Sequence, residues 1–73
     1  MLEIHAQWDD EAKVWYATSD DVPGLCVEAP SIEIMVERLR VIIPDLMELN
    51  LGIVGKQFEF HVISERTAIA EAA

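Results

Sequence analysis

The side chains that could do chemistry in this chain are acids, two histidines and one cysteine. The acids include two short runs, Asp9-Asp10-Glu11 and Asp20-Asp21. Carboxylates that converge on one point can hold the magnesium ions of a metal-dependent nuclease. Both runs stand where the chain is expected to turn, however, and Asp commonly stabilises turns by accepting hydrogen bonds from the turn's own backbone. The sequence therefore favours turns over a metal site.

The two histidines form a second candidate, because we expect both on the polar side of strands that lie next to each other. Glu3 and Glu59 belong to the same sides as His5 and His61. Such a patch could bind a metal or respond to pH near neutrality. Two histidines without a defined third ligand are a weak metal signal. The ordinary alternative is a solvated sheet face that carries His–Glu pairs.

Four strands are predicted to position these residues, at 2–8, 13–19, 25–29 and 57–64. The first alternates cleanly between apolar and polar residues, which is typical of a half-buried strand. In the second, Trp15 and Ala17 fall on one side, whereas Val14, Tyr16 and Thr18 fall on the other. The last strand again alternates, with its phenylalanines on one side and His61 on the other. These patterns predict a sheet with one apolar face.

A long amphipathic helix is predicted over residues 32–50. Ser31 suits the N-cap, Glu33 complements the helix dipole, and Asn50-Leu51-Gly52 reads as the end. The expected core-facing stripe contains Ile32, Met35, Val36, Leu39, Ile42, Leu46 and Leu49. Pro44 removes one hydrogen bond and crowds the preceding turn. We therefore expect either a kinked helix or two abutting helical pieces.

The order of elements predicts an α+β fold. Three strands form an antiparallel meander, and a right-handed crossover through the helix returns the fourth strand parallel to the first. The expected sheet order is 3-2-1-4, with the helix on one face. Residues 1–65 would form a single domain and residues 66–73 a short tail. The two acidic turns would then lie at opposite ends of the sheet, which excludes a joint metal site.

Apolar residues outside the expected core predict an interface. On or beside the open side of the sheet these are Val14, Tyr16 and Cys26, and on the helix flank they are Ile34, Val41, Ile43 and Met47. Contiguous apolar surface of this kind usually marks a contact with another protein. The alternative is that Pro44 rotates the helix so that some of these four flank residues point into the core. Cys26 is expected to fill space rather than to react, since neither histidine is expected close to it.

Composition narrows the function classes. The 73 residues are 52% hydrophobic and carry a net charge of −9. A small core with this much apolar surface suggests a homodimer or larger homo-oligomer. The acidic balance argues against direct binding to nucleic acid and favours a basic protein partner. No membrane span, cofactor motif or signal peptide is expected, and the single cysteine suggests the cytoplasm.

The run from Lys13 to Leu25, KVWYATSDDVPGL, followed by Glu28-Ala29-Pro30-Ser31, resembles the HicB antitoxin family. Nearly the whole chain, including PDLMELN at residues 44–50, resembles short stand-alone bacterial relatives of HicB that are uncharacterised. The resemblance implies a truncated ribonuclease H-like fold. It also implies that the domain could bind and inhibit a small basic RNA-cleaving toxin. The DNA-binding segment of HicB proteins is not expected here, because the chain ends at Ala73.

The sequence thus predicts a non-enzymatic, self-associating protein-interaction module that could act as an antitoxin. Two alternatives stay open. One is a small-ligand or metal-binding protein that uses the His5/His61 patch on the open sheet face. The other is a cryptic nuclease remnant.

Overall fold

Apolar and polar residues alternate at the start of the chain, and these residues form strand β1 (Leu2–Asp9). Ile4 and Ala6 are buried, whereas Glu3 and His5 are exposed. The computed structural model describes residues 1–73. After β1 come β2 (Val14–Thr18), β3 (Val27–Ala29), α1 (Ile32–Leu51) and β4 (Phe60–Glu65). The strands match the predicted ones, but β3 and β4 begin two and three residues later than expected.

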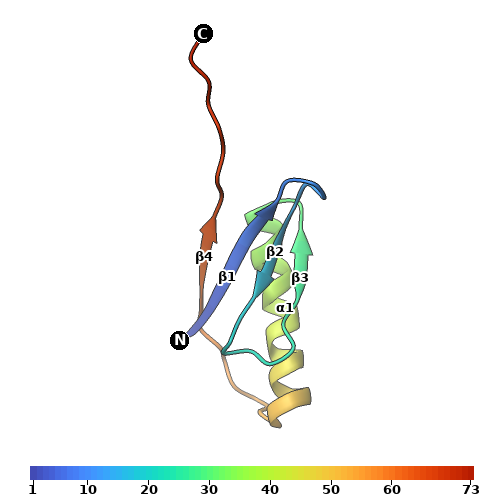
Figure 1. The fold of residues 1–73 in the computed structure, drawn as a ribbon. Helices are drawn as coiled ribbons and strands as arrows, with labels where there is room; N and C mark the ends of the chain where they lie inside the picture. Colours follow the sequence, from blue (N-terminus) through green and yellow to red (C-terminus); the bar gives the residue numbers. More distant parts are fainter.

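The four strands form one sheet in the order β3-β2-β1-β4 (Figure 1). β1 pairs antiparallel with β2, and β2 pairs antiparallel with β3. β4 pairs parallel with β1, with Leu2 opposite Phe60 and Ile4 opposite Val62. The predicted α+β fold and strand order are confirmed.

α1 is one continuous helix. Ser31 caps it by accepting a hydrogen bond from the backbone N–H of Ile34 at 3.2 Å, and Gly52 ends it with a left-handed φ of 67°. Pro44 lies inside the helix without dividing it, so the alternative of two abutting pieces is wrong. Pro44 has no N–H to give to the carbonyl of Arg40. Both residues are exposed, so water can reach this site.

The buried stripe of the helix agrees with the predicted one at Met35 and Leu39 and departs from it in the second half of the helix. The predicted residues Ile42 and Leu46 are partly buried against the core. Met35, Leu39, Ile43 and Met47 are buried, whereas Leu49, expected in the core, is 80% exposed. A step of four residues turns about 40° further than one helical turn, so this stripe winds around the helix. A winding stripe suits a helix that lies against a twisted sheet.

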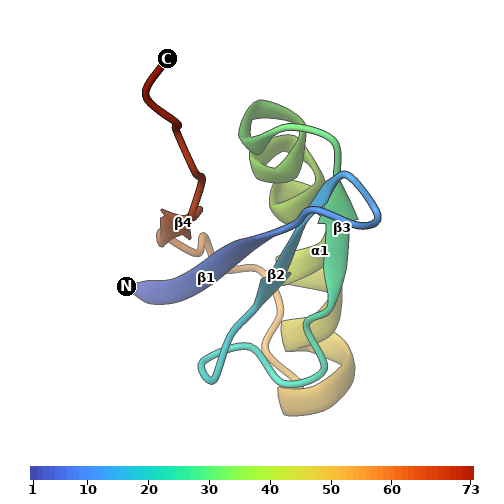
Figure 2. The same cartoon turned by 45° about the horizontal axis from the view of Figure 1, so that its top comes forward.

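The core lies between α1 and the β2–β3 side of the sheet, as Figure 2 shows. Ile4, Ala17, Val27 and Ala29 from the strands meet the buried helix residues, and Val22 and Leu25 close the end from the loop between β2 and β3. β4 stands away from the helix, so its apolar side chains Phe60 and Val62 are only half-buried.

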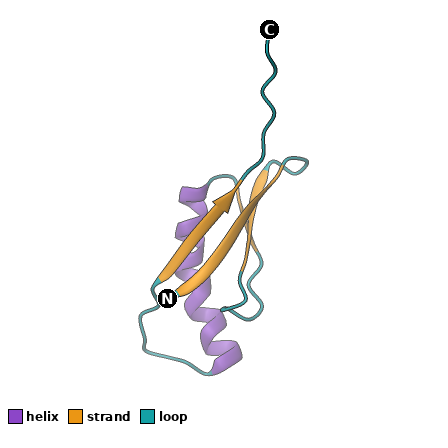
Figure 3. Cartoon of the chain, turned by 60° about the vertical axis from the view of Figure 1, so that its left-hand side comes forward, coloured by secondary structure: helices purple, strands orange, loops and turns teal.

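Residues 66–73 leave the end of β4 as an extended, exposed tail (Figures 1 and 3). The tail makes the molecule 55 Å long and 21 Å by 19 Å across. The radius of gyration is 14.2 Å, against about 11 Å for a compact domain of this length. No helix has the length and apolar character needed to cross a membrane.

Candidate functional site

The side of the sheet that faces away from α1, here called the open face, is polar and acidic. Alternation and strand register place on it Glu3, His5, Gln7, Asp9, Val14, Tyr16, Thr18, Glu28, His61, Ile63 and Glu65. None of the four strands contains Lys or Arg. The open face therefore offers carboxylates without a single strand-borne cation to neutralise them.

The structure assembles most of the predicted polar patch on this face. His5 Nε2 lies 3.1 Å from Glu3 Oε1, and Glu3 is in register with His61 on the neighbouring strand. Glu59 lies just before β4 and is exposed, as are both histidines. The patch therefore contains the His–Glu pair that the sequence offered as the ordinary alternative to a metal site.

Asp20 and Asp21 lie at the same end of the open face as Glu3. Asp21 Oδ2 accepts a hydrogen bond from the backbone N–H of Glu3 at 2.8 Å, and Ser19 Oγ donates to the Glu3 carbonyl at 2.6 Å. Together Glu3, His5, Asp20 and Asp21 line a small hollow of about 190 Å³. No group of three or more His, Cys, Asp or Glu side chains is arranged to hold a metal ion. Asp21 and Ser19 therefore fix this loop to β1.

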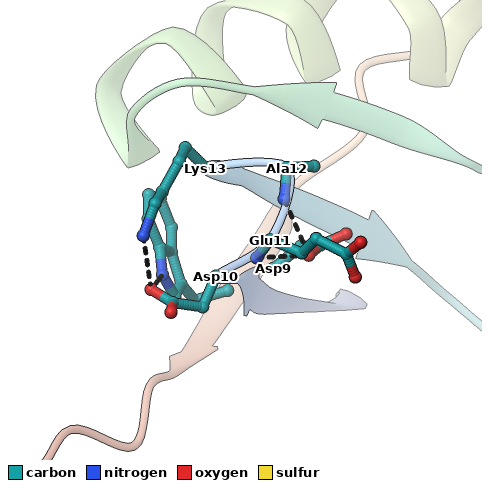
Figure 4. Close-up of polar contacts among 6 residues, drawn as sticks. Asp9, Asp10, Glu11, Ala12 and Lys13 are labelled. Carbon is teal, nitrogen blue, oxygen red and sulfur yellow. Dashed lines mark hydrogen bonds and ion pairs between the residues drawn. The ribbon is translucent and has the colours of Figure 1, made fainter.

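The other acidic run forms the turn between β1 and β2 (Figure 4). Asp9 Oδ1 accepts hydrogen bonds from the backbone N–H groups of Glu11 and Ala12, each at 3.1 Å. The Lys13 N–H donates to the Asp9 carbonyl at 2.8 Å, and Lys13 adopts a left-handed φ of 58°. This is the turn chemistry that the sequence predicted for these residues.

The two runs cannot share a metal ion. Asp21 bonds to β1 at Glu3, whereas Asp9 pairs with Val14 at the far end of the same strand. Six residue steps along β1 separate Glu3 from Asp9, and they span about 20 Å. The separation that was expected from the meander is confirmed.

Asp10 belongs to a cluster of aromatic and charged groups that the sequence did not predict. Trp8 Nε1 donates to Asp10 Oδ1 at 3.1 Å, and Lys13 Nζ lies 3.0 Å from the same oxygen. Two contacts lower the pKa of Asp10 below its ordinary 3.8. The hydrogen bond from Trp8 has the larger effect, and Lys13 adds to it. The Arg66 guanidinium stacks 4.1 Å from the centre of the Trp8 ring, which itself meets Trp15 edge-on. Only the pairing of β4 with β1 brings Arg66 here, so no local pattern could have shown it.

The predicted interface residues do not form one surface. Val14 and Tyr16 lie on the open face, and Tyr16 donates a hydrogen bond to Gln7 there. Cys26 is exposed just before β3. Ile34 and Val41 are exposed on α1, which covers the opposite side of the sheet.

Met47 is a correction to the predicted interface, because its side chain is only 5% exposed and belongs to the core. Ile43, also expected on the flank, is fully buried as well. The alternative that part of the helix set turns inward was right for these two residues.

A groove between α1 and the segment that leads into β4 was also not predicted. Its volume is about 640 Å³, and its lining comprises Leu39, Arg40, Ile43, Pro44, Lys56, Gln57, Phe58, Glu59 and Phe60. The groove exists because α1 packs on β2 and β3 and leaves the β4 side of the apolar face uncovered. Sequence periodicity identifies an apolar face but does not show how much of it one helix covers.

These features define a small α+β domain: a mixed four-stranded sheet, one covering helix and an acidic open face. The chain belongs to the family described as domain of unknown function DUF1902, whose model matches residues 1–71. It is similar to a hypothetical protein, TTHA1013, from the extremely thermophilic bacterium Thermus thermophilus. The two chains are 40% identical over 96% of each, and their structures agree with a TM-score of 0.70. No curated protein matches the chain.

Proposed function

We propose that this chain is a non-enzymatic, HicB-like protein-binding module that associates with itself and binds a small basic protein, in the manner of an antitoxin. The observation that carries the proposal is the acidic open face. Glu3, Glu28 and Glu65 lie on strands that contain no Lys or Arg, and Asp20 and Asp21 extend the negative charge at one end. Complementary charge of this kind steers a cationic partner and rejects polyanions such as RNA.

The antitoxin class follows from the resemblance of KVWYATSDDVPGL to HicB proteins, together with this charge. A protein that binds RNA commonly presents Lys and Arg to the phosphates, so a face without cations suits such a protein. The DUF1902 family has no stated function, and the Thermus relative is a hypothetical protein, so binding must be measured directly.

The test is capture of the partner by tagged chain from the organism that makes it. A double variant at the open face, Asp20→Lys with Glu28→Lys, is compared with a matched variant elsewhere, Glu48→Lys with Glu71→Lys. All four carboxylates are exposed, and none of their side chains makes an ion pair or hydrogen bond in the structure. We expect wild type and the matched variant to retain a small basic protein that cleaves RNA, and the open-face variant to lose it. Capture of the chain alone, or equal capture by both variants, would overturn the proposal.

Metal addition tests the alternative that the histidine patch holds a metal. His5 already pairs with Glu3, and no third ligand converges on the two histidines. Binding of a metal ion to the folded state would raise the melting temperature. Because the patch offers no complete ligand set, we expect zinc or magnesium in excess to leave the melting temperature unchanged. A rise that disappears in the His61→Ala variant would favour the metal-binding alternative.

A further inference from the structure

We propose that β4 is the edge at which two copies of this chain join, antiparallel about a two-fold axis, to form one eight-stranded sheet. The inference rests on the self-association in the proposed function and specifies its surface and register. It concerns the outer edge of the sheet, whereas the basic partner is assigned to the open face.

β4 presents an unprotected row of backbone hydrogen-bonding groups. It pairs only with β1, and Leu2 donates its backbone N–H to the carbonyl of Glu59 at 2.9 Å. A parallel ladder uses every second residue of each strand, so the N–H and C=O groups of Phe60, Val62 and Ser64 point outward. Edge strands are normally protected by Pro, Lys, bulges or short length. β4 has six residues and none of these devices.

The other edge of the sheet is not comparable. β3 has only three residues, and Pro30 follows it directly. Arg38 of α1 also donates a hydrogen bond to the carbonyl of Glu28 in the middle of β3. The available edge is therefore β4.

Apolar surface lies beside this edge. Phe58, Phe60 and Val62 are half-buried on the helix side of the sheet, next to the groove of about 640 Å³ along α1. A two-fold axis perpendicular to the sheet keeps the helix sides of both copies together. In a register with Ile63 opposite Ile63, Val62 of each copy lies diagonally beside Val62 of the other. Arg66 of one copy then lies opposite Phe60 of the other. The second copy would thus cover part of the apolar surface that one helix leaves open.

Charge distinguishes the two registers that are centred on β4, one at Val62 and one at Ile63. Directly opposite residues of an antiparallel pair point to the same side of the sheet, and the two-fold axis puts the helix side of both copies on one side. Odd-numbered residues of one copy must therefore lie opposite odd-numbered residues of the other, and even-numbered opposite even-numbered. A register with Val62 opposite Val62 would set Glu59 against Glu65, and like charges in direct opposition are destabilising. With Ile63 opposite Ile63, His61 instead faces Glu65 twice, and Val62 and Ser64 exchange backbone hydrogen bonds. A second copy of this chain therefore complements the edge in that register.

The same register gives the tail a neighbour. In the single chain residues 67–73 are all exposed, and Ile69 is 88% exposed. In the pair, Thr67 to Ala70 of one copy run alongside Lys56 to Glu59 of the other, at the mouth of its groove. The tail thus extends the contact beyond the six residues of β4.

A symmetric disulfide tests the register. Ile63 bonds inward to β1, so Ile63 opposite Ile63 is a non-hydrogen-bonded pair with Cα atoms about 4.5 Å apart, within reach of a disulfide. The experiment places Ile63→Cys in a Cys26→Ser background, so that only one thiol is present. Its matched control is Glu28→Cys in the same background, on the opposite edge strand. We expect mild oxidation to link the first variant quantitatively into a reducible dimer and to leave the control monomeric under denaturing conditions.

Light scattering and a variant of the β4 edge distinguish a wrong edge or register from the absence of self-association. We expect wild type to have twice the 8.2 kDa mass of one chain at high concentration. Ser64→Pro removes only an outward N–H, so it should weaken dimerisation at least tenfold, whereas Ser64→Val should not. A wild-type dimer without the Ile63→Cys cross-link would overturn this edge and register while leaving self-association intact. A monomer at all concentrations would overturn self-association itself.

Discussion

Asp10 shows how much of this acidic surface is local turn chemistry. Its carboxylate accepts from Trp8 and pairs with Lys13, and both contacts favour the charged form. Asp10 and Lys13 are exposed and Trp8 is half-buried, and their contacts stabilise the end of the hairpin.

The lowered pKa of Asp10 predicts a pH dependence of stability. A carboxyl whose pKa is lower in the folded than in the unfolded state stabilises the fold above its ordinary pKa. That contribution is lost as the pH falls from 3.8 through the lower folded value. We expect Asp10→Asn to be less stable than wild type at neutral pH, and the difference to vanish in acid, in urea titrations across this range. Glu11→Gln, which removes a carboxylate without contacts, should show no such dependence.

Met47 and Leu49 form a matched test of the corrected helix face. Met47 is 5% exposed and Leu49 80% exposed, although the sequence pattern suggested the reverse. We expect Met47→Ala to lower the free energy of unfolding by about 2 to 4 kcal/mol through loss of buried contacts. Leu49→Ala should change it by less than about 0.5 kcal/mol. Equal effects in chemical denaturation would contradict the face described here.

Residue types alone could not assign that face. Val41, Ile42 and Ile43 are consecutive, so apolar residues surround much of the helix and several stripes fit the pattern. Turn chemistry was easier to predict, because Asp9 and Ser31 act on backbone groups within three residues. Contacts such as Arg66 on Trp8 depend on strands far apart in sequence.

At the scale of elements, Pro44 lies inside α1, although the helix neither ends nor divides there. The helix is continuous through Pro44, and both Pro44 and Arg40 are exposed. Pro44→Ala would restore the hydrogen bond to the Arg40 carbonyl and remove the ring's steric conflict. We expect the free energy of unfolding to rise, by at most about 3 kcal/mol.

Val41→Ala, also on the exposed side of α1, serves as the control for helix propensity alone. Its effect should stay within about 0.5 kcal/mol. A loss of stability in Pro44→Ala would show that the ring contributes packing at the groove that outweighs the missing hydrogen bond.

Element order was the most predictable level of this structure. Alternation identified every strand, and the handedness of crossovers then left one economical sheet order. The late starts of β3 and β4 were less predictable, because loop residues such as Leu25 and Phe58 are as apolar as the strands they precede. The groove depends on where α1 lies across the sheet, and sequence periodicity does not predict that position. The open edge depends on the order of the strands.

At the scale of the whole molecule, the net charge of −9 gives the two proposed interactions opposite responses to salt. Two copies of the chain repel each other, so added salt should strengthen the homodimer by screening. Binding of a basic protein to the open face should weaken under the same change, because screening removes the attraction. Dissociation constants measured for both complexes at low and high sodium chloride test this. A homodimer that weakens with salt would require ion pairs at its interface that outweigh this repulsion.

The parallel pairing of β1 with β4 also determines when this fold can be completed. Leu2 meets Phe60, so a contact between the first and last strands must wait for nearly all of the chain to be synthesised. Until then β1 has a partner on one side only, and its apolar residues stay accessible on the ribosome. Contacts this distant in sequence slow folding. Nascent chains arrested before residue 60 should therefore be far more sensitive to proteases than the released protein.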